Sequence, residues 1–282
     1  MKKVLIGIFF TILIMVISSP ASAANNQIMV DGVYIKTDVA PEARNSRVMV
    51  PLRVVGENLG ANVNWTNSEV TITQNKMEVK LKINSNEVLK NGEKLLIDVK
   101  PYIKKSRVFV PLRFIAETFG SKVNYGNSTV TIDTEPLIID GVKVKALQHE
   151  YHMTMGGVVQ HIKGNAYNKN IYNYFIENKG SKVEAPASYS WHYLSVDPGG
   201  YYKAGQYDFL DQEGNSIKRF DIYTLMESFP PETLEGYPKA LIYDATENQW
   251  YLFTNTAIQS INQLIDKATN NGFIEIISNT VV

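Results

Sequence analysis

The chain has 282 residues, 44% of them hydrophobic, and its 28 Lys and Arg balance its 28 Asp and Glu. It contains no cysteine, which excludes disulfides and cysteine ligands for a metal. A formal net charge of zero gives no general attraction to nucleic acid, so nucleic-acid binding is not expected. A chain of this length can bury enough surface to fold without disulfides, most naturally as two domains.

The first 23 residues have the pattern of a secretory signal peptide. Met1-Lys2-Lys3 is basic, residues 4–17 form an apolar run, and Ala21 and Ala23 form an A-x-A cleavage pattern. An uncleaved anchor is the alternative, but a bilayer span needs about 20 apolar residues. We therefore expect cleavage after Ala23 and a secreted, extracellular protein that has no membrane span and is associated with the cell wall or released.

One stretch of the chain occurs twice at an offset of 60 residues. Residues 48–72 and 108–132 are identical at 14 of 25 positions, and further matches precede both copies. Self-similarity at a fixed offset indicates a duplicated folding unit. The sequence predicts two repeats, at about 26–83 and 86–134, within one domain spanning residues 24–135.

Each copy predicts the same short elements. An alternating apolar strand is ended by a proline, which can start a helix because it has no N–H to leave unpaired. A glycine stands where the helix should end, and two strands joined by a turn follow. The shared motif comprises Pro51, Leu52, Arg53, Glu57, Gly60 and Trp65 in the first copy and Pro111, Leu112, Arg113, Glu117, Gly120 and Tyr125 in the second.

These motifs resemble those of the copper amine oxidase-like N-terminal domain, a stalk module of bacterial exported proteins. The resemblance rests on the VPLR strand-to-helix motif, the Gly-ended helix, the Val-Asn-Trp/Tyr strand and the closing Val-Thr-Ile strand, and covers roughly residues 26–134. It implies one domain in which small antiparallel sheets pack on short helices. It implies neither copper nor amine oxidase activity, since the module is neither the copper site nor the catalytic part of those enzymes.

The charged residues of the repeats can be interpreted as purely structural or as ligand-binding. The motif's Arg and Glu stand four residues apart, a spacing that predicts an ion pair within the helix rather than a ligand-binding arginine. Lys100, Lys104, Lys105 and Arg107 form a basic cluster before the second VPLR strand. It could contact an anionic wall polymer such as teichoic acid, but a solvated turn is the more ordinary explanation.

The C-terminal part, residues 136–282, has a different composition, with 13 of the 16 tyrosines beyond residue 140. Turn signals at short spacing predict a mostly β region over residues 142–225, similar to a small sandwich, with strands at Tyr172–Ile176 and Tyr207–Leu210. The last segment predicts a hairpin, a helix and a strand, or ββαβ. The expected fold class of the whole chain is α+β.

Patterns typical of catalytic and metal sites are absent from the sequence. It has no G-x-S-x-G, H-E-x-x-H or phosphate-loop motif. The amine oxidase cofactor motif is missing as well, because the nearest stretch, residues 170–175, lacks both its Thr and its acid. His149 and His152 stand three apart in a predicted strand and should point to opposite faces. We therefore expect no metal, no other cofactor and no enzymatic activity.

The most direct functional hypothesis is a non-catalytic protein that binds or scaffolds at the cell envelope. Its partner would be a cell-wall polymer, a glycan or a surface protein, and the sequence does not set its oligomeric state. Tyr189, Trp191 and Tyr193 alternate, which predicts three rings on one face of a strand and a candidate binding surface. Packing of these rings in the core is the ordinary alternative.

The competing hypothesis is a cell-wall hydrolase with its active site in the C-terminal domain and the repeat domain as a targeting module. It requires histidines to converge in one cleft with acids such as Glu150, Asp208 or Asp221. The four histidines of the chain are His149, His152, His161 and His192.

Overall fold

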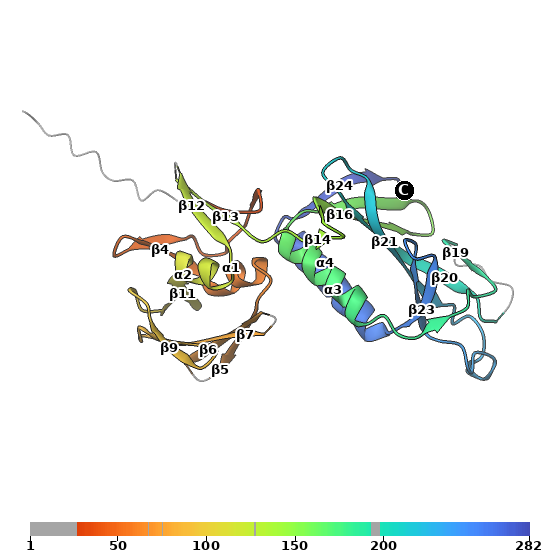
Figure 1. Ribbon diagram of the computed structural model, residues 1–282, viewed down its shortest axis with the longest axis horizontal. Coiled ribbons are helices and arrows are strands. Elements are labelled where there is room, and N and C mark those ends of the chain that lie inside the picture. Colours follow the sequence, from red (N-terminus) through yellow and green to blue (C-terminus); the bar gives the residue numbers. More distant parts are fainter. Residues whose placement is uncertain (1–26, 67, 75, 127, 193–197) are drawn as a thin grey trace, which may run out of the picture.

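The computed structural model describes residues 27–66, 68–74, 76–126, 128–192 and 198–282. The expected signal peptide, with Ala21 and Ala23, and Tyr193 lie outside these ranges. Figure 1 shows two lobes, the first in red to yellow and the second in green to blue. No helix among the described residues is long and apolar enough to cross a membrane.

The first lobe holds three small sheets and two short helices. One sheet has the order β12 (Lys122–Gly126), β13 (Thr129–Asp133), β1 (Gln27–Val30) and β2 (Val33–Tyr34). A second has the order β10 (Tyr102–Lys104), β11 (Arg107–Pro111), β4 (Arg47–Pro51) and β3 (Glu42–Arg44). The third has the order β5 (Asn62–Thr66), β6 (Glu69–Gln74), β7 (Met77–Lys82), β8 (Glu87–Lys90) and β9 (Glu93–Leu96). The helices are α1 (Leu52–Asn58) and α2 (Leu112–Thr118).

Both short helices begin directly after a proline. Pro51 and Pro111 are the last residues of β4 and β11 and the N-caps of α1 and α2, so they precede the first helical turn rather than occupy it. Gly60 at φ +84° and Gly120 at φ +75° follow the helices in the left-handed conformation that the sequence predicts.

The leading hairpin of each repeat joins the sheet of the other repeat. β1 and β2 extend the sheet of β12 and β13, with Gln27 opposite Thr129 in parallel register. β8 and β9, which begin the second repeat, extend the sheet of β5 to β7. The two hairpins turn alike, with φ angles of 49° and 81° at Asp31-Gly32 and 50° and 85° at Asn91-Gly92. Because each half supplies strands to the other half's sheet, the two halves should fold together.

Charged residues at equivalent positions also pair across the two halves. Arg47 binds Asp98, and Arg107 Nε donates to Asp38 Oδ2 at 2.7 Å. All four side chains are about half exposed. Exposed pairs contribute little to the free energy of unfolding. They therefore join the two halves at equivalent positions but stabilise them little.

The second lobe is built on a nine-stranded sheet with two helices on one face (Figure 1). The predicted sandwich over residues 142–225 is wrong, because the strands from β16 to β21 all lie in this one sheet. The sheet order is β18 (Lys182–Val183), β23 (Gln249–Phe253), β22 (Ala240–Asp244), β21 (Ser216–Leu225), β20 (Tyr201–Leu210), β16 (Ala146–His152), β17 (Gly157–Ile162) and β24 (Ile274–Asn279), and β19 (Tyr189–Ser190) pairs with β20. The other elements are α3 (Asn165–Glu177), α4 (Asn255–Asn270), the 3-10 helix η1 (Pro231–Thr233) and the hairpin of β14 (Ile138–Ile139) and β15 (Val142–Lys143). The chain is therefore α+β.

The Asn-rich helix α3 overturns a local prediction. The sequence predicts turns and a strand over residues 165–176, but these residues are helical. Asparagine is a poor helix former, so local preference opposes the helix. Tyr167, Ile171 and Phe175 recur every four residues and are all buried. Phe175 stacks on Phe220 of the sheet with ring centroids 4.7 Å apart. Packing on the sheet therefore decides the conformation of this segment.

A polar network joins the two lobes. The Asp31 carboxylate accepts hydrogen bonds from the backbone N–H and the hydroxyl of Thr134, at 2.8 and 2.7 Å, and from the backbone N–H of Asn165, at 2.9 Å. A side chain of the first lobe thus caps the first turn of α3. The Tyr167 hydroxyl donates to Asn58 Oδ1 of α1 at 2.8 Å. The main hydrophobic core also contains residues of both lobes.

Replacing Tyr167 by phenylalanine is expected to weaken this junction. Asn58 is 1% exposed, and its Nδ2 already lacks a partner among the described residues, so loss of the hydroxyl also leaves its Oδ1 unsatisfied. We expect the free energy of unfolding to fall by about 1–3 kcal/mol, the cost of an unsatisfied buried polar group. Urea unfolding measures the change, with Tyr172→Phe on the same helix as the matched control. Equal losses in the two variants would contradict this role of the Tyr167 hydroxyl.

Candidate functional site

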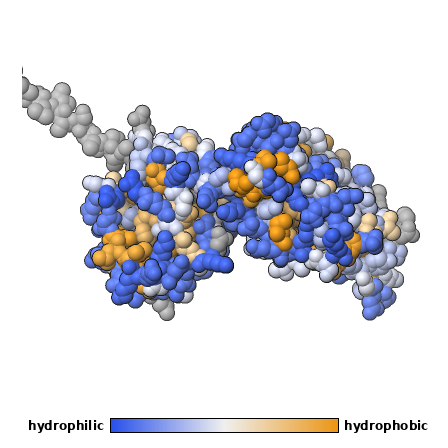
Figure 2. Space-filling view, in the orientation of Figure 1, coloured by the Kyte–Doolittle hydropathy of each residue, from blue (hydrophilic) through white to orange (hydrophobic). Residues whose placement is uncertain are grey.

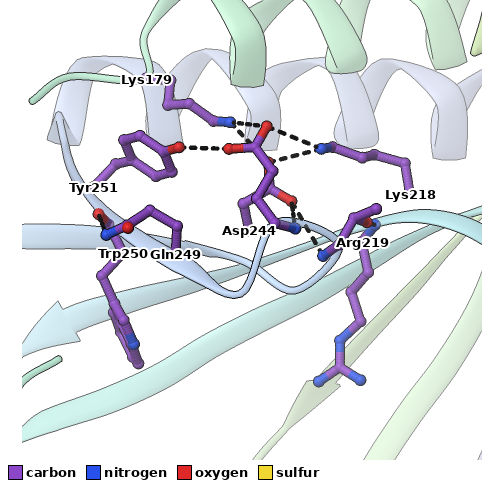
Figure 3. A network of polar contacts seen from close by, with 9 residues as sticks. Lys179, Lys218, Arg219, Asp244, Gln249, Trp250 and Tyr251 are labelled. Carbon is purple, nitrogen blue, oxygen red and sulfur yellow. Dashed lines mark hydrogen bonds and ion pairs between the residues drawn. The ribbon is translucent and has the colours of Figure 1, made fainter. Parts of the chain in front are cut away.

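The face of the nine-stranded sheet opposite α3 and α4, called the polar face below, carries a cluster of charged side chains. Successive side chains of a strand point to opposite faces, and Figure 3 shows Arg219 pointing away from its β21 neighbour Lys218. Arg219 and Asp221 therefore share the polar face. A bulge between Lys203 and Gly205 shifts the pairing of β20 with β21, which brings Lys203 of β20 beside Asp221.

Lys203 and Asp221 form the centre of the polar face and are 5% and 1% exposed. Lys203 Nζ lies 2.9 Å from Asp221 Oδ2 and donates to Gln206 Oε1 at 2.7 Å. Arg219 donates two hydrogen bonds to the same carboxylate, at 2.9 and 2.8 Å. Burial lowers the pKa of Lys203, and the neighbouring carboxylate opposes that change. Each buried charge thus has an opposite charge in contact, as burial requires.

Trp191 connects this buried centre to the surface. Lys203 Nζ lies 4.5 Å from the centre of the Trp191 ring, a cation–π contact. The His152 ring stacks on Trp191 with centroids 4.1 Å apart and planes 11° apart. His152 Nε2 lies 2.9 Å from Glu150 Oε1. The end of β16 and the segment after β19 are therefore held together by ring stacking and charge.

These side chains border a pocket of about 360 Å³, a volume at the lower end of the range for small-ligand sites. Its walls come from β16, β17, β24 and the segment after β19. The side chains of His152 and Glu150 are about one-third and one-quarter exposed, so solvent reaches both of them. We call this site the Trp191 pocket and define it by Glu150, His152, Trp191, His192, Ser278 and Thr280.

The four histidines do not converge on one site. His152 and His192 line the Trp191 pocket. His149 lies on the helix-covered face, as the strand spacing predicts, where it is 7% exposed and stacks on Tyr207 at 4.5 Å. Burial lowers the pKa of His149 to about 4, so its imidazole is neutral at pH 7. His161 lies outside the residues that line the pocket.

Of the three acids considered for an active site, only Glu150 lines the pocket. Asp221 is buried under its arginine and lysine partners. Asp208 is 5% exposed and accepts hydrogen bonds from Gln206 and Ser216, both at 2.8 Å. These acids therefore lie on one face of the sheet. Most of their carboxylate oxygens already accept hydrogen bonds from, or form ion pairs with, side chains of the protein.

The aromatic residues predicted to share one strand face have different surroundings. β19 contains only Tyr189 and Ser190, so the prediction of a strand that carries both Tyr189 and Trp191 is wrong. Tyr189 packs edge-on against Trp250 and Tyr223, with centroids 4.9 and 5.6 Å away. The Trp191 ring instead meets the histidine and lysine of the pocket. Trp191 alone of these two residues belongs to the candidate site.

A second charged cluster lies on the helix-covered face (Figure 3). Asp244, which is 0% exposed, lies 2.7 Å from Lys179 Nζ and 2.8 Å from Lys218 Nζ. Glu247 pairs with both lysines and accepts a hydrogen bond from the Tyr251 hydroxyl. That hydrogen bond and the lysines lower the pKa of Glu247 to about 2. The charged groups of this cluster thus pair with one another. Through Lys179, they connect the end of α3 to the sheet.

Comparison with known protein families decides what the first lobe is. Residues 29–141 match the family model of the copper amine oxidase N-terminal domain. This region is a copper amine oxidase N-terminal domain. The match ends in the turn between β14 and β15, at residue 141 rather than at the expected boundary of residue 135. Searches of curated proteins and of solved structures found no significant match.

Within the copper amine oxidase N-terminal domain, the two copies of the shared motif have different surroundings. Arg113 Cζ lies 4.8 Å from the centre of the Tyr125 ring, and Arg113 Nε lies 3.7 Å from Glu117 Oε1, the pairing that the spacing predicts. The corresponding Arg53 and Trp65 instead line a groove of about 410 Å³. Only the second copy therefore covers its aromatic ring with its own arginine.

The basic cluster of the copper amine oxidase N-terminal domain is partly neutralised. Lys104 pairs with Glu42, and Arg107 pairs with Asp38. Lys100 and Lys105 are exposed and form no ion pair with the described residues. Across the described residues, no group of three or more His, Cys, Asp or Glu side chains is placed to hold a metal ion.

Sequence reasoning missed two central residues of the site, Lys203 and Arg219. A usable signal exists for the second, because Arg219 and Asp221 carry opposite charges and stand two residues apart, the spacing that places two side chains on one face of a strand. Lys203 could not be assigned to the polar face by alternation, since the bulge in β20 changes which residues share a face.

Proposed function

We propose that this protein is exported and acts without catalysis at the cell envelope, where it binds a wall polymer through the Trp191 pocket. The pattern of the first 23 residues supports export. The copper amine oxidase N-terminal domain supports a scaffold role, since it is not a catalytic module by itself. The second lobe then carries the ligand site.

The observation that carries this proposal is the internal pairing of the charges beside the pocket. A glycoside hydrolase needs a pair of carboxyl groups that can reach the substrate. Asp208 and Asp221 are buried, and their oxygens are engaged by side chains of the protein. The pocket itself is lined by the stacked Trp191–His152 pair, by the single carboxylate of Glu150 and by hydroxyl groups. This arrangement is better suited to holding a ligand than to transferring a proton.

The junction between the lobes supports a scaffold that presents the pocket in a fixed orientation. Asp31 of the first lobe binds Thr134 and caps α3, and Tyr167 of α3 bonds to α1. Lobes that share a core and hydrogen bonds resist relative movement more than lobes joined only by a linker. A polymer bound by the second lobe would therefore be held at a defined place relative to the first lobe.

One observation favours a wall hydrolase as the second candidate. The Glu150–His152 pair, with its oxygen and nitrogen 2.9 Å apart, lines the same pocket as Ser278. An acid, a histidine and a serine are the residue types of a nucleophilic hydrolase site. In this alternative the first lobe targets the enzyme to the wall.

A sedimentation assay with purified cell envelopes tests the proposal. The chain without residues 1–23 is expected to sediment with the envelopes. Trp191→Ala should lower the affinity at least about tenfold, a loss typical of a central aromatic anchor. His161→Ala is the matched control, because it removes another aromatic side chain of the second lobe outside the pocket. Soluble wall fragments are measured in the same samples.

The outcomes separate the two candidates. Binding without fragment release, weakened by Trp191→Ala and not by His161→Ala, supports the proposal. Fragment release that is lost in both His152→Ala and Glu150→Gln would replace it by the hydrolase. Equal sedimentation of the wild type and a folded Trp191→Ala variant would show that the pocket is not the envelope site.

A further inference from the structure

A groove on the copper amine oxidase N-terminal domain has the composition of a separate binding site. It lies where the start of α1, β5 and the turn from β10 to β11 meet, and its volume is about 410 Å³. Trp65 is 41% and Ile103 54% exposed there. Figure 2 shows hydrophobic surface, in orange, on this lobe. We call the site the Trp65 groove and define it by Leu52, Arg53, Trp65, Ile103, Arg107 and Val108.

The duplicated motif provides an internal comparison for this groove. In the second copy, Arg113 lies over the Tyr125 ring and is paired with Glu117. In the first copy, Arg53 has no carboxylate within ion-pair distance and no cation–π contact among the described residues. The arginine that is satisfied within one copy is thus unpaired in the other, beside an exposed tryptophan. This difference points to a ligand rather than to a requirement of the fold.

Two guanidinium groups border an apolar floor. Arg53 stands at the start of α1, and Arg107 of β11 also lines the groove, with its Nε donating to Asp38. The second repeat supplies a further apolar residue to this groove, because it has Ile103 where the first repeat has Ala43. The remaining floor residues are Leu52, Val63, Val70 and Val108.

The chemistry of this lining selects one class of ligand. Arginine presents donors that match a carboxylate, while the valine and leucine side chains offer no hydrogen bonds. A sugar would leave hydroxyl groups unpaired against that floor, and a cation would be repelled by the arginines. An apolar body with one carboxylate at its end satisfies both parts of the groove.

We propose that the Trp65 groove binds a carboxylic acid with an aliphatic or aromatic body. The body lies against Trp65 and Ile103, and the carboxylate accepts hydrogen bonds from Arg53. This site lies on a different lobe from the Trp191 pocket and does not depend on envelope binding. It adds a small-molecule ligand to a domain whose proposed role is otherwise to act as a scaffold.

Calorimetric titration of the whole chain with three probes tests this site. Octanoate, octanol and octyltrimethylammonium share one apolar body and differ in the head group. Octanoate is expected to bind at least about tenfold more tightly than octanol, because the neutral head loses the charge-assisted hydrogen bond. The ammonium probe should bind most weakly. Arg53→Gln should reduce octanoate affinity to that of octanol, and Arg113→Gln, its counterpart in the second copy, should leave it unchanged.

A second groove variant and a test of the Trp191 pocket variant with octanoate complete the experiment. Trp65→Tyr introduces the residue that the second copy already carries, so the fold should be retained, and it should weaken octanoate and octanol alike. Equal affinity for all three probes, or equal losses in Arg53→Gln and Arg113→Gln, would overturn the proposal. Trp191→Ala should bind octanoate as the wild type does, so that a failure of envelope binding and a failure of this proposal remain distinguishable.

Discussion

Asp244→Ala is expected to lower the free energy of unfolding by about 3–5 kcal/mol, the effect of breaking a buried ion pair from one side. The carboxylate is 0% exposed and lies within 2.8 Å of the ammonium groups of both Lys179 and Lys218. Its removal leaves two positive charges beside the Phe220 ring, whose centre lies 5.8 Å from Lys179 Nζ and 5.1 Å from Lys218 Nζ. Glu247 is nearly half exposed and cannot replace a buried partner.

Urea unfolding followed by circular dichroism measures this loss. Asp266→Ala is the matched control, because this acid is exposed on α4 and surface changes usually stay within about 0.5 kcal/mol. Replacing the whole cluster, with Asp244→Leu, Lys179→Met and Lys218→Met together, should recover much of the stability, since no buried charge remains. A loss below about 1 kcal/mol for Asp244→Ala would contradict the buried pairing.

The features of the first lobe that the sequence predicts correctly depend on few neighbouring residues. Pro51 ends a strand because it cannot donate a ladder hydrogen bond, and Gly60 ends a helix because its φ of +84° suits glycine. The turn at Asn91-Gly92 follows the same logic. Each of these signals acts over a few positions, so a single sequence suffices to recognise it.

The features that the sequence does not predict depend on residues far apart in the chain. Gln27 of β1 pairs in parallel with Thr129 of β13, and no local pattern fixes a register between segments so distant. Helix α3 is another case, because its asparagines favour turns and only the buried side chains spaced four apart favour the helix. Tertiary packing decided both outcomes.

In the candidate site, too, local features could be predicted from the sequence and contacts between distant segments could not. The strand spacing predicts correctly that His149 and His152 face opposite sides of β16, and Trp191 was singled out by its aromatic neighbours. The contact of Trp191 with His152 could not be predicted, because the two residues lie on segments that meet only in the folded sheet. The place of Lys203 depends on a bulge, which alternation does not reveal.

Asp221→Ala is expected to lower the free energy of unfolding by about 3–5 kcal/mol and to disturb the Trp191 pocket. The carboxylate is 1% exposed and neutralises Lys203, itself 5% exposed, from 2.9 Å. Without it, the ammonium must move toward water, and it cannot then keep its place 4.5 Å from the Trp191 ring. Urea unfolding gives the loss, and tryptophan fluorescence reports the change at the ring. Glu213→Ala, in the exposed turn of the same hairpin, is the control and should be nearly neutral.

A double variant separates stability from function at this position. Lys203→Met with Asp221→Leu removes both charges, so most of the lost stability should return, because neither partner is left buried alone. If the charges serve to position Trp191, this stable variant should still bind cell envelopes at least about tenfold more weakly than the wild type. Normal envelope binding by the double variant would mean that the ion pair serves folding alone. A double variant no more stable than Asp221→Ala would show that the loss does not come from the uncompensated lysine.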